Sequence, residues 1–164
     1  MDSCETRVCE NLYKRALLMN FVTILSWNPP NAKSYRAPNL KLPWLDGQRR
    51  RRDSLDAIWV IEECLFLVEL KCFSSESGKD VEKLRRIRDR LGLEQIVTFL
   101  RRQGVEIGKG VTQLVLTIGV NKVDTPIPAD FIVLEVTNEG ISPFFGAQVT
   151  GQAQEKTNRF CHSI

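Results

Sequence analysis

The chain has 164 residues, of which 43% are hydrophobic and 26% charged, a composition typical of one soluble globular domain with its own core. The formal net charge is only +3, and five cysteines without a CxxC pair argue against a zinc ribbon and predict reduced thiols in a cytoplasmic protein. A single histidine, His162, argues against serine or cysteine triads and against metal sites built from several histidines. Any catalysis would therefore depend on carboxylates and lysines.

Apolar residues recur at helical spacing from residue 5 to about residue 20, which predicts an amphipathic helix. This opening is acidic, which argues against a signal peptide, and no apolar run has membrane-spanning length. Residues 28–43 contain four of the seven prolines and are expected to be loop or irregular edge structure. Four consecutive arginines follow: Arg49, Arg50, Arg51 and Arg52. Such a run suits either a solvated loop or a loop that contacts phosphates.

Two apolar runs, 57–61 and 64–73, predict a β-hairpin with its turn at Glu62-Glu63. In this register Asp56 faces Glu69 on the adjacent strand. Two facing carboxylates repel each other unless a cation or a proton lies between them. Glu69 and Lys71 share one strand face, whereas the opposite face is wholly apolar, as in a central strand whose end opens into a cleft.

Helical periodicity extends over residues 79–91 and resumes to about residue 103, with Gly92 as the candidate interruption between the two stretches. Residues 111–120 and 131–138 are apolar and β-branched, as in buried strands. This order predicts an α/β fold, a three-layer sandwich with a central mixed β-sheet flanked by helices. We expect one domain over residues 1–140 and a loosely ordered tail over 141–164.

Oxygen ligands on adjacent strands suit Mg²⁺ or Mn²⁺, which commonly use few protein carboxylates. Such an ion can polarise a phosphoryl oxygen and lower the pKa of a bound water, while a neighbouring lysine stabilises developing charge. Asp56, Glu69 and Lys71 therefore suit metal-dependent phosphodiester hydrolysis. A plainer interpretation is that Asp56 and Lys71 form an ion pair at a sheet edge, or that the carboxylates only stabilise the fold.

Asp56, twelve intervening residues and then Glu69-Leu70-Lys71, following a basic segment, resemble the PD-(D/E)XK nuclease superfamily, although Leu55 stands where the motif has proline. The resemblance implies a restriction-endonuclease-like fold and an Mg²⁺-dependent deoxyribonuclease acting as a DNA endonuclease. It implies that Asp56, Glu69 and the Leu70 carbonyl bind the metal and that Lys71 assists hydrolysis.

Two further positions follow from the same resemblance. Members of the superfamily often add a glutamate from the first helix, for which Glu5 is preferred over Glu10 because it falls on the apolar stripe. Residues 94–100 are similar to the Q-x-x-x-Y signature of the RecB-like branch, with Phe99 in place of tyrosine. Gln95, Phe99 and Arg102 would then share a helix face that meets the DNA backbone.

The expected partner is DNA, contacted through Arg102 and the arginine run, without a membrane. One domain of this size leaves no room for a separate recognition module, so cutting both strands would require a homodimer or larger assembly. The alternative function is a non-catalytic nucleic-acid-binding or assembly subunit with the same fold.

Overall fold

A computed structural model of the chain describes residues 32–35, 40–46, 49–137 and 139–162, with side chains from residue 55 onward in these ranges. The helix expected from residue 5 to about residue 20, including the candidate Glu5, lies outside the described residues.

Eight strands are described. They are β1 (Ala32–Tyr35), β2 (Leu40–Asp46), β3 (Arg49–Leu55), β4 (Ala57–Ile61), β5 (Cys64–Phe73), β6 (Gln113–Lys122), β7 (Phe131–Thr137) and β8 (Gly140–Phe145). A short 3-10 turn, η1 (Ser74–Glu76), precedes α2 (Gly78–Arg102), and α3 (Gly151–His162) follows β8. Six strands form one sheet in the order β1-β4-β5-β6-β7-β8, and β2 pairs with β3 in a separate two-stranded sheet.

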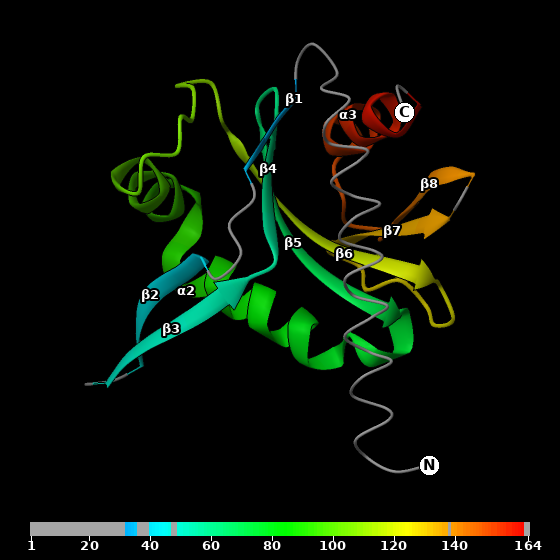
Figure 1. Cartoon of the computed structure of the whole chain (residues 1–164), viewed down its shortest axis with the longest axis horizontal. Helices are drawn as coiled ribbons and strands as arrows, with labels where there is room; N and C mark the ends of the chain where they lie inside the picture. Colours follow the sequence, from blue (N-terminus) through cyan, green and yellow to red (C-terminus); the bar gives the residue numbers. More distant parts are fainter. Residues whose placement is uncertain (1–31, 36–39, 47–48, 138, 163–164) are drawn as a thin grey trace.

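The large sheet is mixed, which confirms the predicted α/β class. Strands β5, β6 and β7 run parallel, whereas β1 and β4 on one side and β8 on the other add antiparallel pairs. Helix α2 packs on one face and α3 on the opposite face, so that the sheet lies between two helical layers (Figure 1). Neither described α-helix has the length and apolar character that crossing a bilayer would require.

The β4–β5 hairpin has the predicted register, with Ile61 opposite Cys64 and Ala57 opposite Val68. Its turn consists of Glu62 and Glu63, and Glu62 adopts a φ of 51°, which is uncommon outside glycine, asparagine and aspartate. Side chains of α3 contact the two acidic side chains of this turn. Lys156 forms ion pairs with both glutamates, and the Gln152 amide donates a hydrogen bond to Glu63.

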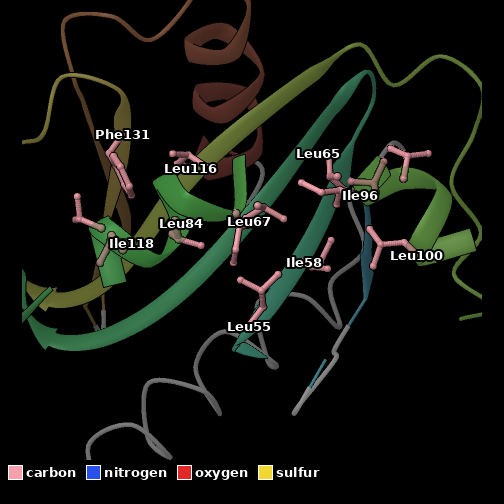
Figure 2. Close-up of a cluster of buried hydrophobic side chains, with 14 of the residues drawn as sticks. Leu55, Ile58, Leu65, Leu67, Leu84, Ile96, Leu100, Leu116, Ile118 and Phe131 are labelled. Carbon is pink, nitrogen blue, oxygen red and sulfur yellow. The ribbon is translucent and has the colours of Figure 1, made fainter. Parts of the chain in front are cut away.

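Strand β5 is buried along nearly its whole length because each face meets a helix. On the α2 face, Leu65 and Leu67 pack with Leu84 and Ile96, as Figure 2 shows. On the α3 face, the alternate residues pack in a second core; these are Cys64, Phe66, Val68 and Leu70. The predicted alternation along β5 is therefore confirmed.

Helix α2 contains a break at Gly92, which has φ 70° and ψ 169°. These angles lie outside the helical region, and glycine adopts them without a Cβ clash. The break divides α2 into a first segment, which follows the end of β5, and a second segment that ends near Gln103. The interruption considered at Gly92 is thus confirmed.

Two regions differ from the sequence-based expectations. Residues 28–43, expected to be loop or irregular edge structure, include β1 and the start of β2, because both segments find antiparallel partners. Residues 141–164, expected to be a loose tail, include most of β8 and all of α3. Ala153, Phe160 and Cys161 of α3 are buried against the sheet, and this burial orders the helix.

Candidate functional site

Asp56 lies at a bend between β3, which belongs to the two-stranded sheet, and β4, which belongs to the large sheet. Strand β5 continues past the last residue paired with β4, so the N–H of Leu70 has no ladder partner from β4. The Asp56 Oδ2 atom accepts a hydrogen bond from that N–H at 2.9 Å. The carboxylate of Asp56 is thereby held at the backbone of the residue between Glu69 and Lys71.

Glu69 is buried, with 4% of its surface exposed, on the α2 face of β5. Burial, followed by the negative charge of Asp56, raises the pKa of Glu69 from 4.5 to about 8, and these effects outweigh the opposing ion pair with Lys83. Such a shift is typical of carboxyl groups at functional sites. The hydrogen bond from the Leu70 N–H places the Asp56 carboxylate at the residue that follows Glu69.

Helix α2 brings two further charged groups to this end of β5. The Lys83 Nζ atom lies 2.7 Å from Glu69 Oε1 and 3.7 Å from Asp80 Oδ1. The Lys71 Nζ atom lies 3.4 Å from Asp80 Oδ2. The site therefore contains five ionisable side chains: two from β5, two from α2, and Asp56 from the bend before β4. Lys71 forms an ion pair with Asp80, whereas the plainer interpretation of the sequence expected one with Asp56.

The sequence analysis missed Asp80 and Lys83. A signal was nevertheless present, because Asp80 precedes Leu84 by four residues and Ile87 by seven and so falls on the apolar stripe of the helix. Asp80 is also in the first turn of α2, where the helix dipole stabilises a negative charge.

Within the described ranges, no three histidine, cysteine, aspartate or glutamate side chains are grouped so that they could hold a metal ion by themselves. Mg²⁺, however, is commonly held by one or two carboxylates with water completing its shell. Asp56 and Glu69 supply such a pair, and the only described hydrogen bond to Asp56 uses a single carboxylate oxygen. The carboxylate oxygens of Asp56 and Glu69 are therefore donors that suit a hard divalent cation. In the structure, however, Glu69 is in contact with the Lys83 ammonium.

Gln95 and Arg102 lie on the second segment of α2, beyond the break at Gly92. With Phe99 they line a groove of about 440 Å³, so the predicted shared face is present. In Figure 2 the neighbouring Ile96 lies beside Leu65, which precedes Glu69 by four residues, or about 13 Å along the strand. The structure therefore does not bring Gln95 to Asp56, Glu69 and Lys71.

The arginine run forms most of β3, and its backbone pairs with β2, so that Arg51 lies opposite Trp44 and Arg49 opposite Asp46. This segment is thus a strand, where the sequence analysis expected a loop, and it leads directly into the bend at Asp56. Two arginines of α2 make contacts within the fold. Arg85 and Arg88 both donate hydrogen bonds to Asp130, which joins α2 to the start of β7.

Comparisons of this chain with protein-family models, with curated proteins and with solved structures gave no match.

Proposed function

We propose that this chain is a metal-dependent DNA endonuclease with a PD-(D/E)XK-type site on a restriction-endonuclease-like fold. The observation that best supports the proposal is the hydrogen bond between Asp56 and the N–H of Leu70. This bond links Asp56, the first acidic residue of the motif, to the central residue of the Glu69-Leu70-Lys71 triplet. The triplet lies near the end of a strand that is otherwise apolar on both faces.

In this proposal Asp56 and Glu69 hold Mg²⁺ or Mn²⁺, with the Leu70 carbonyl as a further oxygen ligand. The bound ion would neutralise charge on the phosphate and lower the pKa of a water molecule bound to it. The Lys71 ammonium is placed on the same strand face as Glu69, where it can stabilise negative charge that develops on the phosphate oxygens. Asp80, 3.4 Å from the Lys71 amine, fixes the direction of that side chain.

The substrate is double-helical DNA in this proposal because β3 places four consecutive arginines next to Asp56 along the chain. Arginine side chains bind phosphates through charge and paired hydrogen bonds. Cutting of two strands would use two copies of the chain, since a C2 pair places one site against each strand.

The test is cleavage of plasmid and linear DNA by the purified protein with Mg²⁺ or Mn²⁺. We expect the wild-type protein to cut DNA and a chelator to abolish the cutting. Asp56→Ala and Lys71→Ala should each reduce the cleavage rate by about 100-fold or more. Lys79→Ala is the matched control for Lys71→Ala because it removes the same side chain from an exposed position outside the site. This variant should cut DNA like the wild type. Undiminished cutting by both site variants would refute the proposal.

One observation favours a second candidate, a nucleic-acid-binding subunit of the same fold that does not cut. The Glu69 Oε1 atom lies 2.7 Å from the Lys83 Nζ atom, so Glu69 already has a cationic partner other than a metal. This candidate predicts salt-sensitive DNA binding that neither a chelator nor Asp56→Ala weakens.

A further inference from the structure

At the end of β5, acidic and basic side chains alternate in a series of close contacts. Glu69 contacts Lys83 at 2.7 Å, Lys83 approaches Asp80 at 3.7 Å, and Asp80 approaches Lys71 at 3.4 Å. The Glu69 side chain is 5% exposed and that of Lys83 is 18% exposed, so water screens these contacts only weakly. Each of the two acidic side chains in this series therefore lies beside a lysine ammonium, which favours its charged form.

Lys83 has two acidic neighbours, and only one of them is a candidate metal ligand. A carboxylate oxygen in contact with an ammonium cannot also bind a divalent ion at full strength. The Lys83 amine, on a flexible four-carbon stem, needs to move only a short way to exchange Glu69 for Asp80. Asp80 is on the same helix at i−3, so the second contact remains available when the first is lost.

We propose that Lys83 is an internal counter-ion of Glu69, and that a divalent cation bound by Asp56 and Glu69 displaces its amine onto Asp80. This inference rests on the proposed metal site. Lys83 is thus a positioning residue: it keeps the buried Glu69 compensated before the metal binds, and its displacement sets the metal affinity.

The inference predicts a specific coupling between two residues of α2. Lys83→Met removes the competitor, and we expect it to tighten Mn²⁺ binding by about fivefold or more. Asp80→Asn removes the site that receives the displaced amine and should weaken Mn²⁺ binding. In the Lys83→Met background, however, Asp80→Asn should change the affinity less than about twofold, because no amine remains to be displaced.

Dissociation constants for Mn²⁺ alone, measured by electron paramagnetic resonance on the full chain, provide the test. Lys79→Met removes the same charge from an exposed position of the same helix and should leave the affinity within about twofold of the wild type. If Lys83→Met does not fold, Lys83→Gln keeps a hydrogen-bond donor without the charge and should also bind Mn²⁺ more tightly than the wild type.

The outcomes separate this inference from the proposed function. Unchanged or weaker Mn²⁺ binding by the Lys83 variants, or strictly additive effects of the two substitutions, would overturn the inference while DNA cleavage by the wild type stands. A wild-type chain that binds no Mn²⁺ would overturn both.

Discussion

At Gly146 the space beside the backbone accommodates a hydrogen atom and nothing larger. A Cβ at this position would lie 2.1 Å from the Pro128 carbonyl oxygen and 2.3 Å from that of Ala129. The N–H of Gly146 also donates to the Phe131 carbonyl at 2.8 Å. The segment after β8 is therefore pressed against the loop before β7, backbone to backbone.

We expect Gly146→Ala to lower the free energy of unfolding by about 1–3 kcal/mol, because rigid backbone atoms would have to move apart. Urea denaturation monitored by circular dichroism gives the value. Gly151→Ala is the matched control, since a Cβ there meets no atom within 4 Å, and it should be neutral or slightly stabilising. Equal effects of the two substitutions would contradict the close approach at Gly146.

The residues of the candidate site differ in how well they could be predicted from sequence. The proximity of Asp56 and Glu69 follows from the period of two in a strand and from a turn centred on two residues, both readable without a structure. The contacts of Asp80 and Lys83 depend on how α2 is rotated and placed over the sheet. That placement results from the packing of Leu84, Ile87 and their partners, which a pattern along the chain does not specify.

At the scale of whole elements, an ion-pair cluster ties α2 to β7. The Asp130 carboxylate accepts hydrogen bonds from Arg85 Nη2 and Arg88 Nη1, both at 2.6 Å. The Arg85 guanidinium also lies 5.5 Å from the centre of the Phe131 ring. These hydrogen bonds lower the pKa of Asp130 from 3.8 to about 2. The charged form of Asp130 is therefore favoured by folding.

The pH dependence of stability follows from this lowered pKa. Between about pH 4 and pH 2 the unfolded chain binds more protons at this residue than the folded chain, so the contribution of Asp130 is present above pH 4 and declines as the pH falls. We expect Asp130→Asn to lower the free energy of unfolding at pH 7, because it removes the charged acceptor of these hydrogen bonds. The loss should be only about 1 kcal/mol, because the ion pairs are partly exposed and water screens them. Melting temperatures of wild type and variant should converge toward pH 2, and a constant difference would contradict the assignment.

Elements with many regularly spaced apolar residues could be predicted from the sequence, whereas elements with few apolar residues could not. Strands β5, β6 and β7 are runs of buried, often β-branched residues, and the first segment of α2 has a regular apolar stripe. Helix α3 consists mostly of polar residues and has only Ala153, Phe160 and Cys161 as buried apolar residues. Its order comes from tertiary contacts, including those with the Glu62-Glu63 turn, which local periodicity does not reveal.

At the scale of the whole molecule, two separate cores lie on the two faces of one sheet. The α3 face is closed by Phe160, whose ring centroid lies 5.7 Å from that of Trp59. Phe160 is 4% exposed, whereas Phe144 on β8 is 39% exposed. The two phenylalanines therefore offer a direct comparison of a buried and an exposed ring in the same molecule.

Phe160→Ala should lower the free energy of unfolding by about 3–5 kcal/mol, because it leaves a cavity between α3 and the sheet. Phe144→Ala removes the same atoms from the surface and should change stability by about 0.5 kcal/mol or less. Both values are measurable by denaturant unfolding. A small effect of Phe160→Ala would indicate that α3 contributes little to the second core.

The coverage of this second core by α3 has a consequence for biosynthesis. The first sheet residues on that face, from Trp59 to Leu70, leave the ribosome before residues 151–162 have been translated. During that interval a wide apolar surface faces solvent, and such surfaces attract chaperones or other nascent chains. Slowed translation of codons just before Gly151 would prolong this exposure and increase the yield of aggregated product.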